Sequence, residues 1–307
     1  MSFVSCYKRS SIILMEGALG ERLKREYNMP FNDIVALADI IYRKGGKEAL
    51  AELWNQYIDI AQKYNLPFIA TTPTRRANKE RVFRAGFSET IVLDNVSLLK
   101  QLRDTSDHEI YIGGLMGCKG DAYKATEILQ VDEAQEFHSW QADLFMKAGV
   151  DFLFAGIMPS LSEAIGMAKA MEQTVLPYII SFMLGDNGKL PDGTTINDAI
   201  LQIDNSVNQK PVCYMTNCIH PTILFKALSY DFNKTPLVKS RFHGIQANTS
   251  ALSPEELDNS AELICSNPIE LAWAVSKLRE LISLKIAGGC CGTDNTHIDQ
   301  IALHLRQ

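Results

Sequence analysis

The feature that most constrains the fold of this chain is a repeated alternation of short apolar runs with longer helical patterns. Continuous apolar runs of this length are typical of parallel strands that are buried on both faces. Eight such runs are expected to be strands: Ile12–Met15, Phe68–Thr72, Glu109–Gly113, Asp151–Ala155, Tyr178–Met183, Val212–Met215, Phe242–Gln246 and Leu284–Ala287. Helices are expected between them at Lys47–Tyr64, Asp132–Ala148, Leu161–Gln173, Ile196–Val207, Pro254–Cys265 and Pro268–Leu281.

Eight strand–helix repeats in 307 residues match a (β/α)₈ barrel better than an open sheet of five or six strands. No linker-like tract of Pro, Gly and Ser divides the chain, so we expect residues 1–307 to form a single α/β barrel domain. Asp132 with Gln135 is typical of a helix start, and Gly149 stands where that helix should end.

Composition and charge narrow the functional classes. A hydrophobic fraction of 46% and a charged fraction of 21% are typical of a soluble globular protein. The net charge of −6 and the lack of a long Lys/Arg run argue against nucleic acid or an anionic membrane as a partner. The apolar run Ile12–Met15 is too short for a signal-peptide core or a membrane span, which predicts a cytoplasmic protein. Nothing in the sequence indicates an oligomeric state.

Seven cysteines are scattered along the chain, and this odd number favours free thiols or metal ligands over a disulfide framework. Chemistry in barrels collects at the carboxyl ends of the strands. Three cysteines are expected at those ends, with Cys218 after the sixth strand and Cys290 and Cys291 after the eighth. The other four are expected elsewhere: Cys6 in the N-terminal tail, Cys118 in a loop, Cys213 inside a strand and Cys265 in a helix.

The two adjacent cysteines belong to a glycine-rich segment, residues 286–293. Adjacent side chains of an extended strand point to opposite faces. Gly288 and Gly289 before the pair and Gly292 after it are expected to allow a tight, non-extended backbone, in which both sulfurs aim at one point. A helical pattern over residues 296–305 follows, so the pair should lie where a buried strand turns into a helix.

Three thiolates on neighbouring strand ends predict a Zn²⁺ site with one open position. Zinc is held tetrahedrally by cysteine sulfurs at about 2.3 Å, and catalytic sites keep one position free. A free thiol, with a pKa of roughly 8.5, is mostly protonated at neutral pH, whereas a zinc-bound thiol is deprotonated. Three anionic ligands keep the bound sulfur electron-rich enough to attack an activated methyl group. The pattern therefore indicates alkyl transfer to sulfur.

The same residues allow other interpretations. Small residues near glycines can simply pack beneath a turn, and glycines after the eighth strand of a barrel can cradle a phosphate. Cys290 and Cys291 could form a strained vicinal disulfide in a thiol sensor, or the three cysteines could hold zinc without catalysis. Asn217 and Asn248 follow the sixth and seventh strands, and they are candidates either for substrate binding or for shaping the loops.

The segment Gly288–Thr293, with Asn217 and Cys218 about seventy residues earlier, resembles the homocysteine S-methyltransferase family. The resemblance extends to Glu16–Gly20, Pro159, Ser162-Glu163 and the run from Ser181-Phe182 through Asp192-Gly193-Thr194. It implies a zinc-containing (β/α)₈ barrel that methylates the thiol of homocysteine to give methionine. By position, it implies Cys218, Cys290 and Cys291 as zinc ligands and Glu16 as the catalytic carboxylate that orients the substrate ammonium.

Family members differ in their methyl donor, which is S-methylmethionine, S-adenosylmethionine, betaine or, in multidomain relatives, a methyl-corrinoid. A chain of 307 residues has no room for a corrinoid domain, so a small sulfonium or ammonium donor is expected. The partners implied by the resemblance are therefore two small molecules, a thiol and a methyl donor.

The sequence departs from the family pattern on the substrate side. The second acidic residue, after the fourth strand, falls at Gly156, and the polar-aromatic run after the second strand has become residues 72–75, Thr-Pro-Thr-Arg. Losing one of two carboxylates around a buried ammonium should cost roughly 1.5–3 kcal/mol. Glu163 lies inside the following helix and is not expected to compensate. An alternative acceptor is therefore a thiol without an amino-acid end, whereas Gly156→Glu should improve homocysteine use if the pocket has merely drifted.

Overall fold

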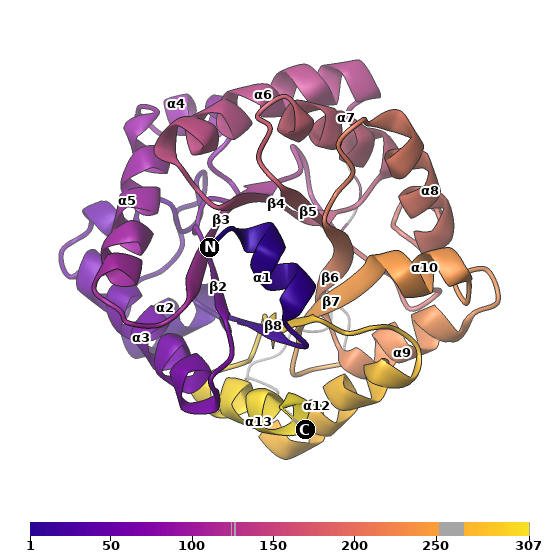
Figure 1. Ribbon diagram of the computed structural model, residues 1–307. Helices are drawn as coiled ribbons and strands as arrows, with labels where there is room; N and C mark the ends of the chain where they lie inside the picture. The colour runs from indigo at the N-terminus through magenta and orange to yellow at the C-terminus, as the bar shows by residue number, and fades with distance from the viewer. Residues whose placement is uncertain (124, 126, 252–266, 307) are drawn as a thin grey trace.

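The computed structural model describes residues 1–123, 125, 127–251 and 267–306. Its centre is a closed barrel of parallel strands, in which each strand pairs with its sequence neighbours and β8 closes against β1. This arrangement confirms the (β/α)₈ barrel (Figure 1). The strands are β1 Ile13–Met15, β2 Phe68–Thr71, β3 Ile110–Gly117, β4 Phe152–Met158, β5 Tyr178–Phe182, β6 Cys213–Ile219, β7 Phe242–Ala247 and β8 Ile286–Gly289.

Helices surround the barrel, and those predicted within the described residues are found to within a few residues (Figure 1). The expected helix Pro254–Cys265 lies outside the described residues. The α-helices are α1 Phe3–Arg9, α2 Gly20–Glu26, α3 Gly46–Tyr64, α4 Lys79–Arg84, α5 Thr90–Asp104, α6 Val131–Ala148, α7 Leu161–Glu172, α8 Ile196–Ser206, α9 Pro221–Ser229, α10 Pro236–Arg241, α12 Pro268–Lys277 and α13 Asn295–Leu305. Two 3₁₀ turns, η1 and η2, cover Ile40–Tyr42 and Leu278–Glu280.

The ends of α6 show how local sequence sets a boundary. The helix begins at Val131, because Gln130 and Glu133 form the reciprocal capping box there. The expected start at Asp132 with Gln135 is therefore wrong by one residue. Gly149 has a φ of +68° and ends the helix, as predicted, since glycine adopts this left-handed conformation without steric cost.

Strands β4 and β6 extend beyond the apolar runs that predicted them. Gly156 and Cys218 therefore lie within strands, and the expectation that they follow strand ends is wrong. Polar and small residues continue these strands because the neighbouring strand still offers partners for backbone pairing. Asn217, for example, pairs with Gln246 of β7. Each extension contains a residue in the left-handed region, Ile157 at φ +56° and Cys218 at +59°, and the pairing register shifts at both places.

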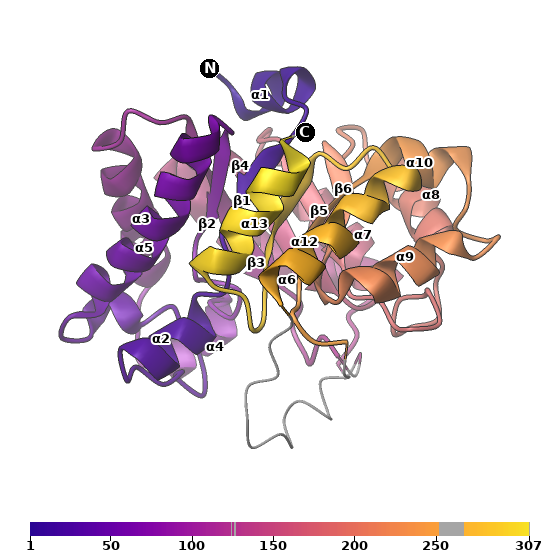
Figure 2. The same ribbon diagram turned by 90° about the horizontal axis from the view of Figure 1, so that it is seen from below.

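The N-terminal end of the barrel is covered by α1, a helix that the sequence analysis did not predict in the N-terminal tail (Figures 1 and 2). Phe3 stacks on Phe152 inside the barrel, with ring centroids 4.2 Å apart. Cys6 is fully buried, and the Tyr7 hydroxyl hydrogen-bonds the His243 ring. A short helix of mixed composition thus closes one end with apolar side chains. No helix among the described residues has the length and apolar character required to cross a membrane.

Candidate metal centre

Three cysteines from two strands meet at the carboxyl end of the barrel. The Sγ atoms of Cys218, Cys290 and Cys291, hereafter the thiol cluster, all lie within 4.8 Å of one another. The Cys218 and Cys290 sulfurs are 2.7 Å apart, and all three residues are free thiols. Sulfurs about 2.3 Å from one tetrahedral ion would be roughly 3.8 Å apart, so the three side chains can converge on a single cation.

The bulge in β6 aims Cys218 at the other two cysteines. Side chains alternate along a strand, and Cys213 and Met215 belong to the barrel interior. Regular alternation would therefore turn residue 218 outward, toward the helices. The left-handed backbone of Cys218 and the register shift between Asn217 and Ile219 change this direction. A non-glycine residue in this conformation carries strain that the surrounding structure must hold.

The glycines before the cysteine pair act differently from the prediction. Gly288 and Gly289 are extended residues of β8, not parts of a non-extended turn. They allow close packing: a Cβ at Gly288 would lie 2.6 Å from Met15 Cβ, and one at Gly289 would overlap Thr293. Only Gly292, with a φ of +79°, supplies the predicted left-handed turn after the pair.

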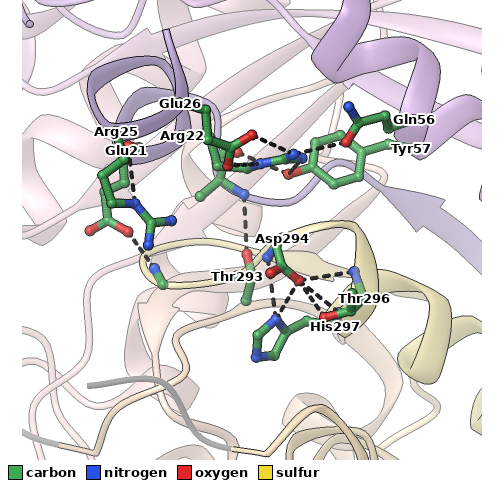
Figure 3. A network of polar contacts seen from close by, with 12 residues as sticks. Glu21, Arg22, Arg25, Glu26, Gln56, Tyr57, Thr293, Asp294, Thr296 and His297 are labelled. Carbon is green, nitrogen blue, oxygen red and sulfur yellow. Dashed lines mark hydrogen bonds and ion pairs between the residues drawn. The ribbon is translucent and has the colours of Figure 1, made fainter. Parts of the chain in front are cut away.

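The segment after Cys291 is held by a polar network at the start of α13 (Figure 3). Thr293 donates its hydroxyl proton to the Cys290 carbonyl at 2.6 Å and accepts the Ala18 N–H at 3.1 Å. The Gly292 N–H donates to the Glu21 carboxylate, while Asp294 caps the helix by accepting the Thr296 and His297 N–H groups. The turn that presents the two cysteines is thus tied to the end of β1 and to α2.

Asn217 and Asn248, predicted as substrate contacts, hydrogen-bond the protein around the cluster. The Asn217 carboxamide oxygen accepts the Ile157 N–H at 3.1 Å and the Ser181 hydroxyl at 2.6 Å, so it joins β6 to β4 and β5. The Asn248 carboxamide oxygen accepts the Cys291 N–H at 3.1 Å. Both asparagines therefore support the backbone beside a cysteine, and their contact with a substrate stays a prediction.

The protonation of the thiol cluster fits a cation site. Hydrogen bonds from Cys290 and Cys291 lower the pKa of Cys218. The hydrogen bond with Cys218 in turn raises the pKa values of Cys290 and Cys291 above the ordinary range. One thiolate therefore forms readily, and burial beside it opposes two more negative charges. A cation at the centre would remove this repulsion, and three sulfur ligands favour zinc among the common metals.

Glu16, the predicted ammonium partner, lies at the end of β1 on the same edge. Its carboxylate accepts the Thr71 N–H at 3.1 Å and the Thr71 hydroxyl at 2.5 Å. Burial raises the pKa of Glu16 to about 7, although both hydrogen bonds oppose this shift. Such a carboxylate is well suited to bind a substrate cation, because the cation would offset the cost of burying its charge.

Gly156 stands where the resemblance places a second carboxylate. A Cβ added at Gly156 would lie 2.7 Å from Leu115 Cδ1, so Leu115 of β3 covers this position. Glu163 of α7 is engaged elsewhere, because its carboxylate accepts the Lys119 N–H at 2.7 Å and lies 3.0 Å from His138 Nε2. The prediction that Glu163 does not replace the missing carboxylate agrees with these contacts.

Tyr123, in the loop after β3, was missed by the sequence analysis. The negative charge of Cys218, and then burial, raise the pKa of Tyr123. No motif surrounds this tyrosine, so only the fold reveals its place. The remaining cysteines in the described part of the chain lie apart from the cluster, with Cys213 at the opposite end of β6 and Cys118 just after β3.

Comparison with known proteins agrees with this geometry. A family model described as homocysteine S-methyltransferase matches residues 13–305. The curated homocysteine S-methyltransferase YbgG of Bacillus subtilis (strain 168) is 24% identical over 191 residues, which are 61% of this chain. The match covers 57% of that relative, so this chain spans little more than half of its length.

Solved structures of the homocysteine methyltransferase MmuM from Escherichia coli share the fold. The metallated form has a TM-score of 0.77 at 19% identity, covering 97% of this chain and 98% of that chain. The oxidized form has a TM-score of 0.76 at 20% identity, with 98% and 97% covered. Since the family model spans the barrel from β1 to α13, the chain belongs to the homocysteine S-methyltransferase family.

Proposed function

We propose that this protein is a zinc-dependent S-methyltransferase, which moves a methyl group from a small sulfonium or ammonium donor to the thiol of homocysteine, giving methionine. The observation that carries the proposal is the convergence of three cysteine sulfurs at the open end of a barrel of this family. YbgG and MmuM are both named as homocysteine methyltransferases. Residues 1–307 would act as one domain, and free thiols suit a reducing compartment such as the cytoplasm.

Cys218, Cys290 and Cys291 would hold the zinc ion. Zinc bound by three thiolates supplies the Lewis acidity that deprotonates an acceptor thiol at neutral pH. The protein keeps this side of the site rigid through Asn248, which bonds the Cys291 N–H, and through Thr293, which bonds the Cys290 carbonyl. Tyr123 acts to lower the pKa of Cys218, which favours its thiolate.

Glu16 would bind the ammonium group of the acceptor. With a pKa of about 7, the Glu16 carboxyl is half protonated near neutral pH, and an arriving ammonium favours its charged form. The Thr71 N–H and hydroxyl fix the direction of the carboxylate. Held at its thiol end by the cluster and at its ammonium end by Glu16, the acceptor would meet the donor methyl group in line, which is the arrangement that a displacement requires.

The experiment that tests the proposal is calorimetric titration of anaerobically purified, zinc-loaded protein with L-homocysteine in buffers of different ionisation heat. We expect binding with release of about one proton, lost in Cys290→Ala and retained in Cys213→Ala, whose sulfur is at the other end of β6. Incubation with homocysteine and either S-methylmethionine, S-adenosylmethionine or betaine should then yield methionine with one donor. Binding without proton release, or no methionine with any donor, would contradict the proposal.

A further inference from the structure

A cavity of about 360 Å³ opens at the carboxyl end of the barrel, between the loop that follows α2 and the ends of β2 and β3. Pro73, Arg75 and Arg76 line it from the segment after β2, and Leu115 lines it from β3. In the chain, α2 precedes the first lining segment and α4 follows the segment after β2. Both helices lie at the end of the barrel opposite α1 (Figure 2). The cavity therefore lies at the same end as the thiol cluster.

Two positive charges line the cavity. Arg75 and Arg76 are half-buried, and within the described part of the chain neither guanidinium forms a hydrogen bond or an ion pair. Burial and then the charge of Arg75 lower the pKa of Arg76, although Asp121 acts in the opposite direction. The carboxylate that also lines the cavity belongs to Asp33, which is exposed to solvent. Half-buried guanidinium groups without a partner are costly, and an anionic ligand would remove that cost.

The backbone places Arg75 against the end of β3. Arg75 crosses the end of β3, where a Cβ at Gly117 would lie 2.6 Å from Arg75 Cγ and 2.7 Å from its carbonyl oxygen. The positive charge of Arg75 also contributes to the environment of Cys218. Leu115 forms a wall of the cavity and at the same time covers Gly156. The cavity thus adjoins the position where the resemblance places a second carboxylate.

We propose that this cavity binds the carboxylate group of one of the two substrates, with Arg75 and Arg76 as its partners. The inference rests on the proposed function and specifies its substrate class, because it requires an anionic end on either the acceptor thiol or the methyl donor. A guanidinium group binds a carboxylate through two parallel hydrogen bonds, which a neutral or cationic end cannot form. The substrate end of the site therefore selects negative charge through two arginines and positive charge through Glu16.

Matched ligands distinguish the two substrates. For the acceptor, zinc-loaded protein is titrated calorimetrically with 3-mercaptopropionate, 3-mercaptopropylamine and 3-mercapto-1-propanol, which share a three-carbon chain and differ in the charge of the group opposite the thiol. For the donor, betaine is compared with tetramethylammonium, which lacks the carboxylate. In either the acceptor series or the donor pair, we expect the double variant Arg75→Met and Arg76→Met to weaken binding of the carboxylate ligand about ten- to a hundredfold. In the same comparison, binding of the ligands without a carboxylate should weaken less than threefold.

Arg84→Met is the matched control, because Arg84 is exposed on α4 and does not line the cavity. It removes a nearby positive charge and should leave every affinity within about threefold. The inference is overturned if neither carboxylate ligand depends on Arg75 and Arg76, or if Arg84→Met has an equal effect. A failure of the proposed function differs from this, because then even 3-mercapto-1-propanol would bind without releasing a proton. Unchanged affinity for the neutral thiol shows that the double variant is folded.

Discussion

The two ends of the barrel shift the pKa of a cysteine side chain in opposite directions. Strand β6 begins with Cys213 and carries Cys218 near its other end. Burial among apolar residues below α1 raises the pKa of Cys213 to about 12, so this thiol stays protonated. At the open end, hydrogen bonds from Cys290 and Cys291 lower the pKa of Cys218. Five residues along one strand therefore separate a thiol that stays protonated from one whose thiolate is favoured.

This difference has a structural cause that residue type alone does not show. At the closed end, Phe152, Cys213 and Met215 belong to one apolar cluster with Phe3 and Tyr7 of α1. At the open end, Ile157 and Cys218 have left-handed backbones beside register shifts, and the Cys218 side chain converges with those of Cys290 and Cys291. Stability should therefore depend on one end and metal binding on the other, which the following substitutions test.

The largest expected effect is the loss of zinc in Cys218→Ser. Losing a hydrogen bond that supports a metal ligand typically weakens metal binding about 10- to 100-fold. Removing one of three thiolate ligands should have a larger effect and weaken zinc binding by more than a hundredfold. Cys213→Ser, on the same strand, should keep the affinity of the unchanged protein. Competition with a chromophoric chelator measures both values. Equal losses in the two variants would remove the distinction between the two ends.

Phe3→Ala should have the reverse profile. Phe3 is fully buried and stacked on Phe152, so its truncation leaves a cavity and should lower the free energy of unfolding by about 3–5 kcal/mol. Zinc affinity should be unchanged, since α1 lies at the opposite end from the thiol cluster. Denaturant titration with and without zinc measures the effect. A zinc affinity that falls together with stability would show that the ends are coupled.

Glu16→Gln should change how stability depends on pH. Because the folded-state pKa of Glu16 is about 7 and its ordinary value is 4.5, the folded protein holds a proton between these values that the unfolded chain releases. This contribution is fully present below pH 4.5 and is lost as the pH rises through 7, by about 3 kcal/mol at most. The glutamine variant should therefore gain stability relative to the parent protein between pH 5 and pH 8. Parallel pH profiles would contradict a raised pKa.

Asn217→Ala should give the smallest effect, and it tests the connection between β6 and β4, the two strands that carry bulges. It removes the acceptor of the buried Ile157 N–H, which should cost about 1–3 kcal/mol of unfolding free energy. Zinc affinity should also fall about tenfold, because the residue next to Cys218 loses its anchor on Ser181. Asn217→Asp keeps the acceptor and should recover most of the affinity. If it recovers stability but not affinity, Asn217 acts on the fold alone.

Much of the barrel could be predicted from the sequence, because buried parallel strands are written as continuous apolar runs. The ends of β4 and β6 could not, since Gly156 and Asn217 join the ladder through partners on other strands. The helix α1 was missed because its seven residues of mixed polarity show no clear helical pattern in the sequence. The apolar contact that holds it, with Phe152, exists only in the folded barrel.

The site divides in the same way. The positions of Cys218, Cys290 and Cys291 near the ends of predicted strands were enough to predict that they meet, because these ends converge at one rim of a barrel. The role of Gly288 was misjudged, because its need for glycine comes from Met15 on the neighbouring strand. Tyr123 and the cavity beside Arg76 had no signal, since a loop residue acquires its neighbours only through the fold.

The closure of the barrel by β8 has a consequence for the order of assembly. Cys290 and Cys291 follow β8, and β8 takes its place between β1, the first strand, and β7. Because Cys218 belongs to β6, all three sulfurs can meet only after β8 has taken its place beside β7. A metal ion held by all three sulfurs would therefore be loaded late in folding, because a partly folded chain lacks the complete set of sulfurs.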